Sequence, residues 1–371
     1  MKTHIHTLPG SAAGTSRAIT RHHFGPELAS GARRALIQAS LHADEIPPML
    51  VAQHLRRRLL ALEQAGRLRG EIVLLPACNP IGLAQQVAGR MQGRFELSTG
   101  HNFNRHYADL AALAAARVQL GDSAADNTRL LRSALHQALS ATPALTPLNA
   151  LRQHLQGLAI DADVVLDLHC DNDAVMHLYG TPHHAAQLGQ LSACLKSPLA
   201  LIAEESGDWP FDEACSMVWP RLQKLLGDRH PVELACFAAT VEHRGETDVA
   251  HAWAEQDAEG LLRFLGAQGF IEGMEAPEAF EISLRPLAGC MPIAAPHAGL
   301  LVWHGGVGRE VAAGEVLGEL IDPVSGECSE LKSPVNGFHF ARELQRWAHG
   351  GQSVAKVAGF DATRSGKLLS L

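Results

Sequence analysis

Short apolar runs alternate with longer amphipathic ones along most of this chain, up to about residue 270. The apolar runs have the length of buried strands and cover 35–40, 71–77, 164–169, 175–179, 199–203 and 236–242. Between them, apolar residues recur at the helical period over 47–64, 110–120, 127–141, 147–156, 211–226 and 250–265. Strands that alternate with helices predict an α/β fold with a mostly parallel central sheet flanked by helices.

The sequence changes character after residue 275. Short apolar segments there alternate with glycine-rich turns, and no long helical pattern appears. This sequence pattern is typical of a small all-β barrel or sandwich. We therefore expect two domains, a catalytic domain over 1–275 and a β-barrel-like domain over 276–371.

Charge and cysteine content limit the classes of function. The 371 residues include 31 Lys+Arg against 39 Asp+Glu, a net charge of −8, which gives no support to nucleic-acid binding. Seven scattered cysteines do not form a disulfide framework and fit a reducing compartment. The polar N-terminus and the absence of a membrane-spanning apolar stretch predict a cytoplasmic protein. A homo-oligomer is left open.

A histidine and a carboxylate stand together at the end of the first predicted strand. His42 follows the run 35–40, Glu45 comes three residues later, and two prolines then open a helical pattern. His169 closes a later strand that is apolar on both faces. Two imidazoles and a carboxylate, with one position left for water, form a catalytic zinc site. His42, Glu45 and His169 are therefore the expected ligands of one Zn²⁺ per chain, and Asp167 is a candidate to orient His169. The alternatives are a packed histidine and a helix-capping carboxylate.

Two further segments contain candidate functional residues. Asn104 and Arg105 precede a helical pattern and suit a carboxylate or a developing oxyanion, unless they belong to an ordinary solvated loop. Glu242 ends another apolar strand and is a candidate general base. Glu246 is its rival, and a salt bridge between Glu242 and Arg244 is the structural alternative.

The order of these motifs resembles the succinylglutamate desuccinylase/aspartoacylase family, relatives of the zinc carboxypeptidases. The resemblance rests on His42-x-x-Glu45, Asn79-Pro, Arg94, Asn104-Arg105, His169 and Glu242, and the glycine-rich tail is similar to that family's β domain. It implies that zinc binds His42, Glu45 and His169, and that Glu242 moves a proton from the attacking water to the leaving amine.

The resemblance also implies roles for the polar side chains of the site. Arg94, or its rival Arg90, would polarise the scissile carbonyl, and Asn104 and Arg105 would hold a substrate carboxylate. The implied substrate is a small molecule, an N-acylated amino acid.

The chain departs from the family pattern at three places. Ala43 stands where the family has Gly, and Phe103 stands in a Leu position. The tyrosine that aspartoacylases supply from the C-terminal domain is absent, because Tyr107 and Tyr179 both precede that domain. These departures leave the acyl group and the amino acid undefined. The expected function is that of a zinc-dependent amide hydrolase (a deacylase). The alternatives are a zinc carboxypeptidase that acts on peptides and a non-catalytic, zinc-stabilised binding protein.

Overall fold

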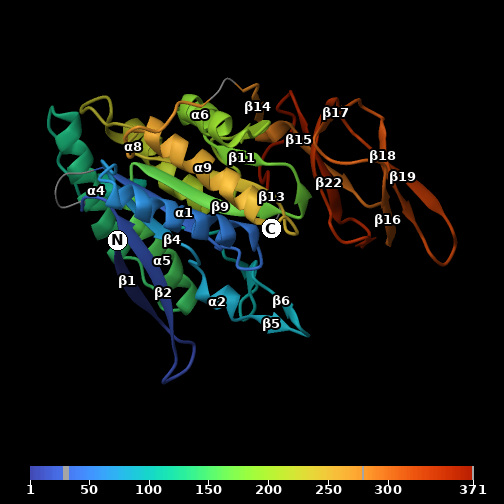
Figure 1. Ribbon diagram of the computed structural model, residues 1–371, viewed down its shortest axis with the longest axis horizontal. Coiled ribbons are helices and arrows are strands. Elements are labelled where there is room, and N and C mark those ends of the chain that lie inside the picture. Colours follow the sequence, from blue (N-terminus) through green and yellow to red (C-terminus); the bar gives the residue numbers. More distant parts are fainter. Residues whose placement is uncertain (28–32, 278–279, 370–371) are drawn as a thin grey trace.

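A large sheet forms the centre of the molecule in the computed structural model, which describes residues 1–27, 33–277 and 280–369 (Figure 1). In spatial order the strands described are β1 (Lys2–Pro9), β2 (Ser16–Phe24), β4 (Glu71–Leu75), β3 (Arg34–Ala39), β9 (Val164–Asp171), β13 (Phe237–Gly245), β11 (His177–Gly180), β12 (Leu199–Ile202) and β14 (Ser283–Pro286). The central strands β4, β3, β9 and β13 run parallel. The predicted α/β fold with a mostly parallel sheet is therefore confirmed.

Helices cover both faces of this sheet. One face carries α1 (Pro47–Gln64), α6 (Ala185–Leu195) and α9 (His251–Ala267). The other carries α3 (Ala111–Ala115), α4 (Ala124–Ser140), α5 (Pro147–Ile160), α7 (Phe211–Ser216) and α8 (Val218–Leu226). Successive strand residues serve opposite faces, so Ile37 packs in the first core and Leu36 in the second. This two-sided burial explains the continuous apolar runs in the sequence.

The N-terminal hairpin and two details of the helices differ from the sequence-based expectation. β1 and β2 form an antiparallel edge hairpin whose exposed positions are mostly polar, so it lacks the apolar run of a central strand. The helical pattern over 211–226 is divided into α7 and α8 at Met217. The helix α6 was not predicted.

Short elements lie between the strands. They are α2 (Pro80–Leu83), β5 (Gln86–Val87), β6 (Arg90–Met91), β7 (Phe95–Glu96), β8 (His101–Asn102) and the 3₁₀ turns η2 (Pro182–His184) and η3 (Leu287–Gly289). Within the described residues, no helix has the length and apolar character that crossing a membrane requires.

The C-terminal part is all-β, as expected, and lies at one end of the molecule (Figure 1). One sheet has the order β10 (Asp173–Ala174), β20 (Gly337–Arg342), β22 (Ser353–Gly359), β15 (Cys290–Ala294), with β17 (Arg309–Val311) on β20. The other has the order β19 (Cys328–Lys332), β18 (Val316–Ile321), β16 (Gly299–Trp303), β21 (Trp347–Ala348).

The N-terminal and C-terminal parts of the chain each contribute a strand to a sheet of the other part. β14 pairs with β12 in the large sheet, and β10 pairs with β20 in the smaller one. The division at 275 stays a prediction.

Candidate metal centre and active site

Three of the predicted site residues converge at the carboxyl ends of β3 and β9. His42 and Glu45 lie in the loop between β3 and α1, and His169 lies within β9. The three residues are 3%, 6% and 2% exposed, and their ligand atoms all lie within 4.8 Å of one another. Ligands in open α/β sheets bind at this edge. The structure thus brings together residues that are up to 127 positions apart in the sequence (42 and 169).

The Glu45 carboxylate joins the two imidazoles. Its Oε1 atom lies 2.7 Å from His42 Nδ1, and its Oε2 atom lies 2.8 Å from His169 Nδ1. The backbone N–H of Cys170 also donates to Glu45 Oε2, at 3.1 Å. Burial alone would raise the pKa of Glu45, but the two imidazoles outweigh it and hold this pKa well below its usual range. Glu45 is therefore a carboxylate at neutral pH, as a metal ligand must be.

An oxygen atom lies close to the Nε2 atom of each ring. His42 Nε2 lies 2.8 Å from Asn102 Oδ1 at hydrogen-bond geometry, and His169 Nε2 lies 2.9 Å from Asp167 Oδ2, an ion-pair contact whose angles are not those of a hydrogen bond. Oxygen partners on the Nε2 side favour a proton there and leave Nδ1 of each ring as the lone-pair donor. Two such nitrogens and a carboxylate fit the donor set of a catalytic zinc site, in which a fourth position is left for water or substrate. Among the described residues, no other group of three or more His, Cys, Asp or Glu meets the same criterion.

The loop that carries His42 is fixed by buried polar contacts. Asn79 caps α2, since its Oδ1 accepts from Ile81 N and Gly82 N, and its Nδ2 donates to Leu41 O. Ala43 N donates to Gly93 O at 3.0 Å. A Cβ atom added to Gly82 would lie only 2.8 Å from the Ala43 methyl group. Gly82 therefore leaves room for the methyl group of Ala43, the residue that stands where the family has glycine.

Arg94 reaches the cluster and Arg90 does not. The Nη1 atom of Arg94 lies 3.3 Å from Glu45 Oε1 and 3.3 Å from His42 Nδ1. Arg90 lies on the exposed hairpin β5–β6 and does not line the cavity at the cluster. Geometry therefore favours Arg94 for any role at the reacting atoms.

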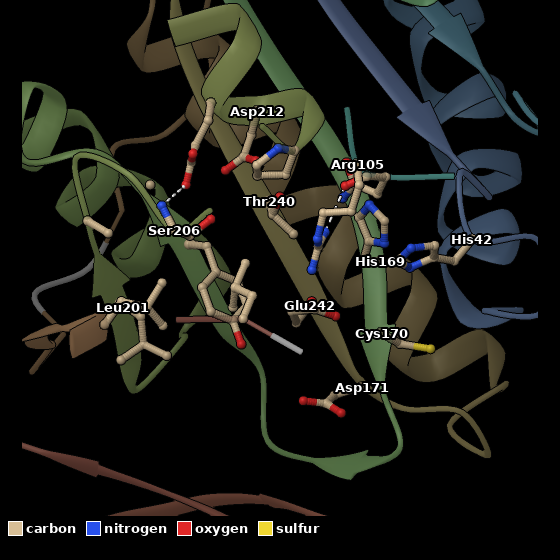
Figure 2. Close-up of a pocket in the computed structure, with 18 of the residues that line it drawn as sticks. His42, Arg105, His169, Cys170, Asp171, Leu201, Ser206, Asp212, Thr240 and Glu242 are labelled. Atoms are coloured by element: carbon tan, nitrogen blue, oxygen red, sulfur yellow. Dashed lines mark hydrogen bonds between the residues drawn. The ribbon is translucent and has the colours of Figure 1, made fainter. Parts of the chain in front are cut away.

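Glu242 faces the cluster from the neighbouring strand. In the parallel pairing of β13 with β9, Glu242 is the direct partner of His169, so both side chains point to the same face (Figure 2). Burial, followed by the nearby Glu45 charge, raises the pKa of Glu242 to about 8. Its rival Glu246 lies in the exposed turn beyond the strand and lines an adjoining groove instead. Burial also raises the pKa of Glu246, to about 7, so the geometry alone favours Glu242 as the acid–base group.

Asn104 and Arg105 are buried beside the same cavity, at 5% and 6% exposure. Asn104 Oδ1 accepts from Phe211 N at 2.8 Å, and Arg105 Nη1 donates to Asn104 O at 2.7 Å. Figure 2 shows the Arg105 guanidinium extending toward the space between His169 and Glu242. The solvated-loop alternative is wrong for this pair, because both side chains are almost fully buried.

Several residues that line the cavity carried no sequence signal. Lys356 comes from β22 of the C-terminal part and forms an ion pair with Asp171, with Nζ 2.6 Å from Oδ2. Tyr179 lines the cavity from β11. Asp212 and Glu213 reach it from α7. Only their positions in the fold connect them with the site, and no motif spacing could have found them.

Comparisons with known proteins agree with this architecture. The sequence model of the succinylglutamate desuccinylase/aspartoacylase catalytic domain matches residues 31–206. A search of curated proteins finds no match. A family protein from Shewanella amazonensis shares 24% identity, covers 96% of this chain and 98% of its own, and superposes with a TM-score of 0.84.

Two other solved structures share the fold. A protein of Shewanella frigidimarina assigned to succinylglutamate desuccinylase/aspartoacylase is 25% identical, with 98% and 99% of the two chains covered and a TM-score of 0.86. The ectoine utilization protein EutE (DoeB) of Ruegeria pomeroyi is 16% identical, with 97% and 95% covered and a TM-score of 0.68. The sequence match and the shared fold confirm the resemblance: residues 31–206 match the catalytic domain of the succinylglutamate desuccinylase/aspartoacylase family, a family of hydrolases.

Proposed function

We propose that this protein is a zinc-dependent deacylase that hydrolyses the amide bond of an N-acylated amino acid or a related small molecule. The observation that carries the proposal is the ligand set His42, Glu45 and His169 with the Glu242 carboxyl opposite it on the adjacent strand. The family match supports an acylated amino acid as the substrate class. One zinc ion per chain would bind, and the reaction would take place in the cytoplasm.

A bound metal ion would supply Lewis-acid chemistry that the side chains alone lack. A zinc ion at these three ligands would act as a Lewis acid and lower the pKa of a water molecule. Glu242 would take the proton of the attacking water and return it to the leaving nitrogen. The pKa of this carboxyl, about 8, suits a group that must both accept and donate a proton near neutral pH.

The two arginines would act at different points of the substrate. Arg94 already reaches atoms of two ligands and would donate hydrogen bonds to the carbonyl oxygen as it gains negative charge. Arg105, fixed beside Asn104, would bind the substrate carboxylate with its planar fork. The first contact strengthens in the transition state, and the second is present throughout.

An activity screen combined with one substitution tests the proposal. Zinc-loaded protein is assayed against a panel of N-acetyl and N-succinyl amino acids, with release of the free amine as the signal. Glu242→Gln should keep its zinc and its fold and lose at least about 100-fold in kcat, the usual scale for a lost acid–base group. Glu246→Gln is the matched control and should keep most of the activity.

Three results would contradict this proposal, each in a different way. Activity that survives Glu242→Gln but not Glu246→Gln would show that the wrong carboxylate was chosen. Cleavage of blocked dipeptides in place of acylated amino acids would indicate a carboxypeptidase. Zinc binding without hydrolysis of any amide would indicate the non-catalytic binding protein.

A further inference from the structure

The strand that carries Glu242 departs from regular pairing directly after this residue. Glu242 is opposite His169, but the next pair along the two strands is Gly245 with Asp171. β13 therefore uses three steps where β9 uses two, which is a β-bulge. Bulges are rare between parallel strands and are over-represented next to active sites, where they redirect a side chain.

The bulge turns the Arg244 side chain to the other face of the sheet. Side chains alternate along a strand, so residue 244 of a regular strand would lie on the same face as Glu242. Arg244 instead has a φ of 64°, in the left-handed region that residues other than glycine rarely adopt. Its guanidinium contacts α9, which lies on the opposite face of the sheet from the cavity-lining helix α7.

Two residues of α9 hold the guanidinium there. Asp257 is 1% exposed, and its Oδ2 atom accepts a hydrogen bond from Arg244 Nη2 and lies 2.8 Å from His243 Nδ1. The guanidinium also lies over the ring of Trp253, 4.4 Å from the ring centre. A buried carboxylate and an aromatic face together favour the guanidinium at this place.

This arrangement keeps a nearby cation away from the Glu242 carboxyl. The salt bridge between Glu242 and Arg244, an alternative that the sequence left open, is not formed, because Arg244 pairs with Asp257. The Oε2 atom of Glu242 is buried and has no hydrogen-bond partner among the described residues. A guanidinium on this carboxyl would occupy the oxygens that a general base needs for the attacking water.

We propose that Asp257 is a positioning residue that holds Arg244 away from Glu242 and so keeps the catalytic carboxyl free to transfer protons. Asp257 does not line the cavity and acts only through Arg244. The inference rests on the proposed deacylase function and on the role of Glu242 in it.

A neutral substitution tests the inference by kinetics. Asp257→Asn keeps the shape of the side chain and removes the charge that holds Arg244, so the guanidinium is free to turn toward Glu242. The value of kcat should fall about tenfold or more, the scale of a hydrogen bond to a charged group, while KM and the zinc content stay unchanged. Glu259→Gln removes an equal charge from the same helix, where it pairs with Arg58 outside the cavity, and should leave kcat unchanged.

A double substitution separates this role from a merely structural one. In Asp257→Asn combined with Arg244→Met, no guanidinium is left to pair with Glu242, so kcat should return to near the wild-type value. A structural role predicts the reverse, because the second substitution removes a further buried side chain. Failure of Arg244→Met to restore the kcat of Asp257→Asn would overturn the inference.

A crystal structure of Asp257→Asn gives a readout that does not depend on activity. The Arg244 guanidinium should lie within hydrogen-bond distance of the Glu242 carboxyl, and a guanidinium still in place over Trp253 would overturn the inference. If Asp257→Asn does not fold, Trp253→Ala changes a residue that is 43% exposed and weakens the same hold. It should also lower kcat, and an unchanged kcat would overturn the inference.

The failure of this inference differs from the failure of the proposed function. Loss of activity in Glu242→Gln with an unchanged kcat in Asp257→Asn would contradict the role of Asp257 alone. Wild-type protein that hydrolyses no amide, or Glu242→Gln that keeps its activity, would contradict the proposed function and the role of Asp257 with it.

Discussion

Replacing Asp167 with Asn tests whether the buried carboxylate behind His169 tunes the metal site. Asp167 is fully buried in β9. Its Oδ1 atom accepts from Gln38 Nε2 at 3.0 Å, and its Oδ2 atom lies 2.9 Å from His169 Nε2. Asparagine has the same shape but no charge. One of its two terminal atoms is also a donor, so it cannot accept from both neighbours.

The expected magnitude follows from these two contacts. A carboxylate that holds the outer nitrogen of a metal-binding histidine raises the basicity of the ring, and its loss typically costs 10- to 100-fold in metal affinity. Asp167→Asn should therefore weaken zinc binding by about 1.4 to 2.7 kcal/mol. Competition with a chromogenic chelator measures this directly. In excess zinc, the zinc-induced rise in unfolding free energy should shrink by a similar amount, since zinc binds the folded state.

A matched carboxylate at the far end of the same strand provides the control. Asp163 directly precedes β9, six residues before His169, and forms an ion pair with Arg132. Asp163→Asn should leave the zinc affinity unchanged. An affinity of Asp167→Asn within about twofold of the wild type would refute the argument, because the expected effect is at least tenfold.

Two further predictions concern binding and stability. Arg105→Lys keeps the charge and loses the bidentate fork, so it should mainly raise KM, whereas Arg94→Ala should mainly lower kcat; steady-state kinetics separates the two, and the reverse pattern would exchange their roles. Glu71 is buried against His23 and Arg34, and although burial opposes its charge, these partners lower its pKa to about 2 from 4.5. Because the folded-state pKa is depressed, the stabilisation is present above about pH 4.5 and is lost as the pH falls toward 2. Glu71→Gln should therefore cost at most about 3 kcal/mol at pH 7 and nearly nothing near pH 2, measured by denaturant unfolding; an equal loss at both pH values would contradict this.

The periodic core and the ordered motifs could be predicted from the sequence. The strands at the centre of the sheet are buried on both faces, so their continuous apolar runs located them, and Pro47–Gln64 was predicted with its bounds. His42, Glu45 and His169 were found because each lies at or just beyond the end of such a run, where parallel sheets bind ligands. The edge hairpin β1–β2 was missed because its exposed face is polar, so its sequence lacks the continuous apolar run that indicates a buried strand.

The rest of the site depends on contacts that only the fold creates. The Lys356–Asp171 ion pair joins residues 185 positions apart, on strands of different sheets. Asp212 lies in a predicted helix, where a carboxylate ordinarily faces solvent. Only the fold shows that Asp212 lines the cavity. The choice between Arg94 and Arg90 likewise required the folded structure, since they lie only four positions apart and no sequence spacing decides between them.

The zinc content of the His169→Ala protein tests the central claim most directly. Elemental analysis of the purified wild-type chain should give one zinc ion per chain. The His169→Ala chain loses one of three ligands and should hold much less zinc and show no deacylase activity, with its fold checked by circular dichroism. Undiminished zinc content in His169→Ala would contradict the proposed metal centre and, with it, the proposed function.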